Sequence, residues 1–149
     1  MKIILFILLW LSLLNGDLNS GDTLPPLALV DQFDNKVKIK NNSTLIISFQ
    51  KSVSSEIQAF IDAKPKHYLK NNNIPYISDM SSAPKFMIKL FSIPKMKKFD
   101  YKVALIYDDD IANKIQREDN KMTVITLSKH KVEKIEFISP SHLEKVLNH

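Results

Sequence analysis

Short apolar runs rich in β-branched residues alternate with stretches of helical spacing along this chain of 149 residues. The run from Thr44 to Phe49 is bounded by polar residues, as a strand buried on both faces would be. Similar short runs cover residues 74–77, 101–107, 122–127 and 132–138. Because helical segments separate the first three runs, this order predicts an α/β fold with a central sheet.

The first helix is expected soon after the run at 44–49. Ser55 and Gln58 fit a capping box, in which two side chains hydrogen-bond the unpaired backbone amides of a first turn. Apolar residues follow at helical spacing as far as Ile61. The pattern therefore predicts a helix that begins at Ser55 and that Pro65 ends or kinks.

A second helix is expected to open at Pro84, because proline suits a first helical turn. Four large apolar residues follow at helical spacing and are expected to share one face: Phe86, Met87, Leu90 and Phe91. Met87 on this stripe is interpreted as a core-filling residue. Pro94 is expected to break the helix, because its ring blocks a helical hydrogen bond.

Turn residues mark two hairpins. Asp34–Asn35 separates Leu27–Val30 from Val37–Ile39, where apolar residues alternate with lysines, and this predicts a hairpin with one face in water. Residues 128–131 separate the last two apolar runs, which predicts an antiparallel pair. The remaining carboxy-terminal residues have helical spacing and are expected to form a terminal helix.

Residues 1–16 have the composition of a secretory signal peptide. Lys2 supplies a positive start, and residues 3–14 are apolar apart from one serine. This stretch is short for a membrane span, which needs about 20 residues. We expect cleavage after Gly16, or as late as residue 20, and an uncleaved amino-terminal anchor is the alternative.

The rest of the chain is expected to comprise a linker at 17–23 and one domain over 24–149. A leader of this kind implies export, and the periplasm of a Gram-negative bacterium is the expected compartment. The exported domain has no cysteine, so it must depend on its own core rather than on disulfides.

Cysteine is absent and glycine nearly so. The lack of cysteine excludes disulfides, thiol redox chemistry, thiolate metal sites and lipid attachment at an amino-terminal cysteine. Gly16 and Gly21 are the only glycines, which excludes a glycine-rich phosphate loop in the folded domain. The sequence therefore argues against nucleotide binding of the P-loop or dinucleotide kind.

The formal net charge of +5 comes from lysines spread along the chain among acidic residues. A nucleic-acid groove would concentrate arginines and exposed aromatic residues on one face, but Arg117 is the only arginine. We therefore expect no nucleic-acid partner. The lysines are interpreted as a solvated surface, with a weak attraction to anionic membranes as the alternative, and residues 94–98 form a short local cluster.

From residue 44 onward, the predicted order of elements is similar to that of the thioredoxin fold. The phrase Leu-Pro-x-Leu-x-Leu-x-Asp-Gln at 24–32 resembles the amino-terminal extension of peroxiredoxin-like and thiol-reductase-like members. The resemblance covers residues 24–148. It implies a thioredoxin-like three-layer sandwich with a central mixed sheet and an amino-terminal β-hairpin extension.

The working residues of that family do not occur in this chain. Redox-active members carry Cys-x-x-Cys, or one peroxidatic cysteine, where this chain has Gln50 to Glu56. Ser54 or Ser55 occupies the place, and a hydroxyl cannot form a disulfide. The family's cis-proline is also missing, because residues 120–123 contain no proline. The resemblance therefore implies a domain without thiol redox activity.

We expect a protein-binding or assembly module, without a cofactor, whose partner is another exported or periplasmic protein. Active members hold an extended polypeptide near the first helix and the proline loop. The resemblance implies that four residues line the corresponding groove here: Gln50, Ser54, Ser55 and Met122. Peripheral or amino-terminal membrane association is a further expectation.

Two alternatives remain open. A copper-handling protein would use thioethers and imidazoles, and the candidate ligands are Met80, Met87, Met96, Met122, His67, His130, His142 and His149. The histidines lack paired spacing and are interpreted as surface residues. An enzyme with non-cysteine chemistry would need a serine beside a histidine and an acid, and no Gly-x-Ser-x-Gly elbow is present.

The run Asp108–Asp110 offers carboxylates to a divalent cation. A calcium loop, however, spaces its oxygen ligands alternately and needs a glycine at its sharp turn. Carboxylates also stabilise the free amides at the start of a helix. We therefore interpret the run as the cap of a short helix over 111–115.

Overall fold

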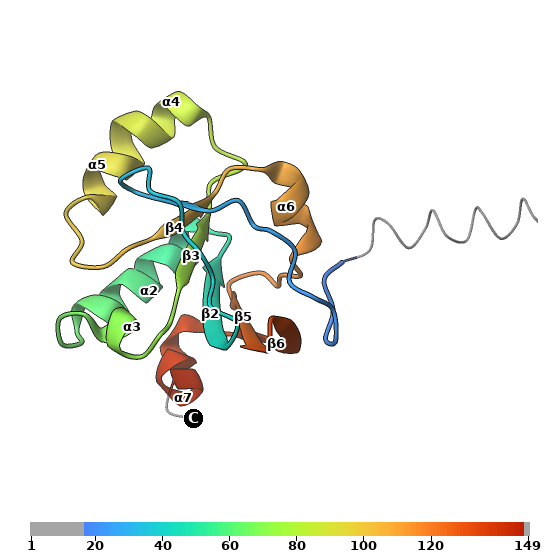
Figure 1. Cartoon of the computed structure of the whole chain (residues 1–149). Coiled ribbons are helices and arrows are strands. Elements are labelled where there is room, and N and C mark those ends of the chain that lie inside the picture. The colour runs from blue at the N-terminus through green and yellow to red at the C-terminus, as the bar shows by residue number, and fades with distance from the viewer. Residues whose placement is uncertain (1–16, 148–149) are drawn as a thin grey trace, which may run out of the picture.

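The computed structural model describes residues 17–147, so the predicted leader at 1–16 and His149 lie outside it. The chain forms one six-stranded mixed sheet with helices on both faces (Figure 1). The strand order is β1-β4-β3-β2-β5-β6. Within residues 17–147, no helix has both the length and the apolar character needed to cross a bilayer.

Strand β2 lies inside the sheet, between β3 and β5. The strands are β1 (Val30–Asp31), β2 (Ser43–Ser48), β3 (Tyr76–Asp79), β4 (Ala104–Ile106), β5 (Met122–Ser128) and β6 (Lys131–Ile138). Strands β2, β3 and β4 are parallel, and the other neighbours are antiparallel. Ile47 pairs with Ile77 on one side and Thr123 on the other. The apolar run predicted as a strand buried on both faces is therefore confirmed as β2.

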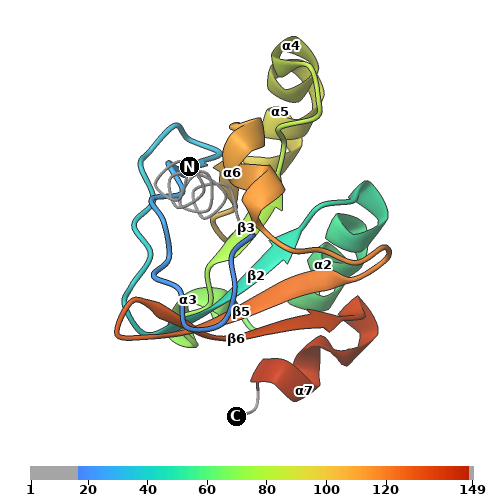
Figure 2. The same ribbon diagram turned by 90° about the vertical axis from the view of Figure 1, so that its right-hand side faces the viewer.

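The helices connect these strands and cover the sheet. They are α2 (Lys51–Asp62), α3 (Tyr68–Asn71), α4 (Lys85–Met87), α5 (Ile93–Met96), α6 (Asp109–Lys114) and α7 (Leu143–Leu147), with a π turn η1 (Ile88–Ser92) and a 3-10 turn η2 (Pro140–His142). Apolar residues of α2, α3 and α7 form one core with the sheet. Residues of α6 and the amino-terminal segment form the core on the other face (Figures 1 and 2).

Helix α2 begins four residues earlier than the capping-box pattern predicts. Gln50 precedes its first turn and makes no side-chain cap, whereas Ser55 lies in the second turn. The prediction that the helix begins at Ser55 is therefore wrong. Val53, Ile57 and Ile61 are its buried residues, so the stripe that packs on the sheet already includes the first turn. Tertiary packing has outweighed the local capping signal.

The prediction that Pro94 breaks the second helix is also wrong. The helical segment continues through α4, η1 and α5, and Pro94 occupies the first turn of α5. A proline lacks an amide hydrogen and clashes with a regular helical carbonyl four residues earlier. The π turn immediately before α5 changes the hydrogen-bond spacing at this point, which accommodates the proline.

The amino-terminal segment is part of the folded domain. Leu18 and Gly21, in the stretch expected to be a linker, donate backbone hydrogen bonds to the carbonyl oxygens of Lys114 and Val132. The predicted hairpin at 27–39 is present but has fewer paired residues than expected. Its turn is closed by Asp31 N–H to Asn35 O at 2.8 Å, while β1 itself pairs with β4.

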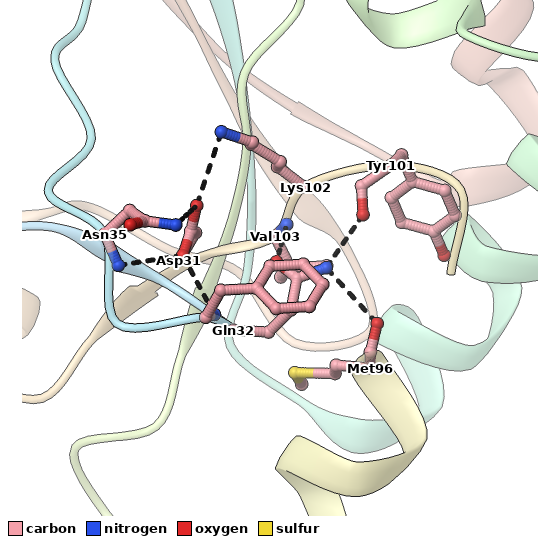
Figure 3. Close-up of polar contacts among 8 residues, drawn as sticks. Asp31, Gln32, Asn35, Met96, Tyr101, Lys102 and Val103 are labelled. Atoms are coloured by element: carbon pink, nitrogen blue, oxygen red, sulfur yellow. Dashed lines mark hydrogen bonds and ion pairs between the residues drawn. The ribbon is translucent and has the colours of Figure 1, made fainter. Parts of the chain in front are cut away.

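Gln32 ties this segment to the edge of the sheet (Figure 3). Its side chain is 1% exposed. The Nε2 group donates to the carbonyl oxygens of Tyr101 at 2.8 Å and Met96 at 3.2 Å, and Oε1 accepts from the Val103 amide at 2.9 Å. One buried amide side chain thus joins β1, α5 and the start of β4.

Asp31 stabilises the turn that follows it. Its Oδ1 accepts hydrogen bonds from the backbone amides of Phe33 and Asn35, and Lys102 lies 3.5 Å from Oδ2 (Figure 3). Burial would raise the pKa of Asp31, but these hydrogen bonds and the Lys102 charge lower it below the ordinary value. The carboxylate is therefore charged in the folded state near neutral pH.

Candidate functional site

A pocket of about 460 Å³ lies at the amino end of α2. It sits beside the carboxyl ends of the parallel strands β2 and β3, where open α/β sheets usually bind ligands. One wall is polar and comes mainly from the start of α2. The other wall includes the apolar residues Met80, Phe91, Met96 and Phe99, together with Ser92 and Lys95. We refer to it as the α2 pocket.

The structure brings three of the four predicted binding residues to this pocket. Gln50, Ser54 and Ser55 all line it. Met122 does not, because its side chain is completely buried in the core beneath α2. In the structure it is a packing residue of β5 rather than part of a groove.

Buried hydroxyl groups lie beside the polar wall of the α2 pocket. Ser54 Oγ donates to Ser48 Oγ at 2.8 Å, and Ser48 Oγ lies 3.0 Å from the hydroxyl of Tyr76 and 3.5 Å from Ser78 Oγ. Burial raises the pKa of Tyr76, so its phenol keeps its proton. The network satisfies polar groups that would otherwise be costly to bury.

The two serines have different environments. Ser54 is half-buried and its hydroxyl points into the network, whereas Ser55 is exposed. Among residues 17–147, no histidine lines the α2 pocket. Neither serine therefore has a histidine in this pocket that could act as its general base.

Gln50 connects the start of α2 to the loop before β5. Its Oε1 accepts a hydrogen bond from the backbone amide of Asn120 at 2.6 Å, and Asn120 has a positive φ of 60°. The resemblance to the thioredoxin fold predicts that thiol-active members carry a cis-proline in the corresponding loop. Residues 17–147 contain no cis peptide bond. Gln50 thus fixes the loop as well as lining the pocket.

Arg117 contacts two residues that line the pocket, and no motif in the sequence predicted this. Its guanidinium carbon lies 3.9 Å from the ring centroid of Phe49 and its Nη1 lies 3.6 Å from Asp79 Oδ2. Phe49 and Asp79 both line the pocket. Phe49 and Asp79 could have been predicted as pocket residues from their positions, because Phe49 follows a parallel strand and Asp79 ends one.

The candidate metal ligands are not gathered at one site. Met80 and Met96 line the α2 pocket, Met87 lies on α4 and Met122 is in the core. The described histidines lie before α3, in the β5–β6 turn and in η2. Within residues 17–147, no group of three or more His, Cys, Asp or Glu side chains could hold an ion.

Asp108 performs the capping role predicted for the aspartate run. Its Oδ1 accepts from the backbone amide of Asp110 at 2.8 Å and from that of Ile111 at 3.4 Å. Helix α6 begins at the next residue, Asp109. The prediction of a capped short helix is therefore confirmed, although the helix starts two residues before 111.

A second pocket of about 550 Å³ lies between the β1 turn and α3 and is more apolar than the first. Phe33, Leu69 and Phe99 are among its lining residues. Tyr101 lines both pockets, and its hydroxyl is buried without a hydrogen-bond partner in the described part of the chain. Burial raises the pKa of this phenol strongly, so it is a neutral hydrogen-bond donor.

No protein-family model and no curated protein matches this chain. Solved structures do match its fold. A putative protein disulfide isomerase from Bacteroides thetaiotaomicron matches with a TM-score of 0.60 at 16% identity, covering 88% of this chain and 87% of that one. A thiol:disulfide interchange protein from Bacteroides sp. gives 0.55 at 14% identity, covering 89% and 92%.

A third match is a cysteine-to-serine mutant of PrxQ from Xylella fastidiosa. It has a TM-score of 0.55 at 17% identity and covers 89% of this chain and 95% of that one. At such identities the matches establish the fold. The chain therefore has a thioredoxin-like fold, as its order of elements predicted, and it contains no cysteine.

Proposed function

We propose that this chain is a cysteine-free thioredoxin-like module that binds a segment of another exported polypeptide in the α2 pocket. The observation that carries the proposal is the pocket itself, which remains open at the amino end of α2 although the chain has no thiol. Without cysteine, the domain cannot exchange disulfides. Binding is the activity that this position of the fold can still support.

The character of the walls favours a polypeptide ligand. Met80, Phe91 and Met96 offer an apolar surface to a side chain. On the opposite wall, the Ser55 hydroxyl and the Gln58 amide can donate and accept hydrogen bonds with a peptide backbone. One structural neighbour is described as a putative protein disulfide isomerase, an enzyme that acts on proteins. We propose that this chain also binds proteins, but without disulfide exchange.

Filling the pocket is expected to weaken binding. The probe is a reduced and carboxymethylated polypeptide that stays unfolded, followed through the backbone amide signals of the isotopically labelled full chain. We expect signals around Ser54, Ser55 and Gln58 to shift. Ser55→Trp should weaken the apparent affinity by about tenfold or more, because the indole would occupy the space that the ligand needs.

Glu56→Trp is the matched control, because Glu56 is the next residue of α2, is exposed and does not line the pocket. It should bind like the unsubstituted protein. Equal weakening by both variants, or shifts that avoid the α2 pocket, would contradict the proposal. Thermal unfolding of both variants distinguishes lost binding from lost folding.

We also propose that the mature protein is exported to the periplasm of a Gram-negative bacterium, with its signal peptide removed. The positive start and the apolar stretch of residues 1–16 support this. Intact-mass measurement of the protein recovered from the exported fraction should show a chain beginning at Asp17, or a few residues later. A full-length mass in the membrane fraction would indicate an anchor instead.

A further inference from the structure

The large apolar side chains predicted to face the core from the second helix are exposed. Phe86 is 63% exposed, Leu90 and Phe91 are each 64% exposed, and Met87 is 41% exposed. The interpretation of Met87 as a core-filling residue is therefore wrong. We call the surface formed by these four residues the α4 face. Contiguous exposed apolar surface of this kind usually marks an interaction site.

The helix has a different set of residues that attach it to the domain. Ile88 is buried, and Ile93 and Met96 pack against the core beneath α2. The α4 end of the segment stands away from the sheet in both views (Figures 1 and 2). Other residues of the same helical segment therefore pack it against the domain. The side chains of the α4 face are not needed for that packing.

The charged residues within the helical segment of the α4 face are all lysines. Five lysines lie in this helical segment and directly after it: Lys85, Lys89, Lys95, Lys97 and Lys98. No aspartate or glutamate occurs from residue 80 to residue 99. This part of the surface therefore favours an anionic partner.

We propose that the α4 face docks on a bilayer that contains anionic phospholipid. A helix that lies in a membrane interface has large apolar residues on one side and lysines beside them, whose stems extend along the lipid while the ammonium groups reach phosphate. The α4 face has this composition on a protruding helix. The proposal is independent of peptide binding, but Phe91 lines the α2 pocket too, so docking would hold that pocket close to the lipid.

The absence of cysteine allows a direct test in the full chain, because a single introduced thiol can be labelled specifically. An environment-sensitive fluorophore is attached through Leu90→Cys, and a control label through Ser128→Cys. The control lies at the β5–β6 hairpin, at the opposite end of the molecule from α4 (Figures 1 and 2). Comparing positions separates docking of this face from partitioning of the apolar residues 3–14.

We expect the Leu90 label to shift to the blue with phosphatidylcholine vesicles that contain phosphatidylglycerol, and the Ser128 label to stay unchanged. The shift should weaken with added salt and be much smaller with phosphatidylcholine alone. Lys85→Gln/Lys89→Gln/Lys98→Gln should lower the affinity measured at the Leu90 label on the order of a hundredfold. Phe86→Ser, in the Leu90-labelled protein, should also weaken binding.

Lys36→Gln/Lys38→Gln/Lys40→Gln removes the same charge from the exposed strip after β1 and is the control. It should retain most of the lipid response. Equal loss from both triple variants, or equal shifts at both labels, would overturn the proposal. A blue shift of the Leu90 label without vesicles, and a doubled mass by light scattering, would indicate a dimer. If Phe86→Ser abolished both, the α4 face would bind a second copy of the chain, and the membrane proposal would be overturned.

Discussion

Replacing Gln32 by leucine is expected to lower the free energy of unfolding by about 3 kcal/mol, because two buried backbone groups lose their partner. The Val103 amide would lose its acceptor, and the Tyr101 carbonyl would lose its donor. Leucine can fill much of the volume but can form neither hydrogen bond. Urea unfolding followed by circular dichroism measures the change.

Gln58→Leu is the control for the loss of one glutamine amide, because Gln58 lies on the partly exposed surface of α2. It should change the free energy of unfolding by less than about 0.5 kcal/mol. If Gln32→Leu were equally mild, the hydrogen bonds drawn in Figure 3 would not be what joins the amino-terminal segment to the sheet.

Met122→Ala is expected to destabilise the domain by about 3 kcal/mol, since it removes a fully buried side chain and leaves a cavity under α2. The same substitution distinguishes two interpretations of this residue. A groove residue would lose ligand affinity at unchanged stability, whereas a core residue loses stability. Thermal or urea unfolding, combined with the peptide titration, measures both quantities.

Met122→Leu provides the volume-conserving control and should cost less than about 1.5 kcal/mol. Its affinity for the unfolded polypeptide should equal that of the unsubstituted protein. A stable Met122→Ala variant with weakened binding would contradict the placement of this side chain in the core.

The strands were predictable because burial on both faces leaves a clear pattern. Thr44 to Phe49 contains the buried residues Leu45, Ile46 and Ile47, so the apolar run and the strand nearly coincide. The run at 101–107 extends further than its strand, because Tyr101 and Val103 are buried outside the ladder of β4. An apolar run indicates that its residues are buried, but buried residues also occur outside strands and helices, so the run does not give the strand's ends.

The helices were predicted less well, for two physical reasons. Ser55 looks like a cap, but the start of α2 is decided by Val53 packing on the sheet three residues after Gln50. The spacing from Phe86 to Phe91 indicates an amphipathic helix but contains no information on what covers its apolar side. The stripe was expected to face the core, but the buried residue of this segment is Ile88.

Part of the candidate site could be predicted because the thioredoxin-like resemblance places the start of α2 correctly. Gln50, Ser54 and Ser55 follow β2 directly and all reach the α2 pocket. The apolar wall could not be predicted, because Phe91 and Met96 come from a helix whose path depends on the π turn before Pro94. The pairing of Gln50 with Asn120 likewise joins residues distant in sequence.

The hydroxyl network behind the α2 pocket gives its polar wall oxygen atoms rather than thiols. Thiols are oxidised to disulfides or sulfenic acids as the redox potential of the compartment rises. The hydroxyls of Ser48, Ser54 and Tyr76 do not undergo these reactions. A ligand bound beside these hydroxyls would therefore meet no thiol that could be oxidised or form a disulfide. If a peptide binds there as proposed, its occupancy would not depend on a thiol–disulfide equilibrium.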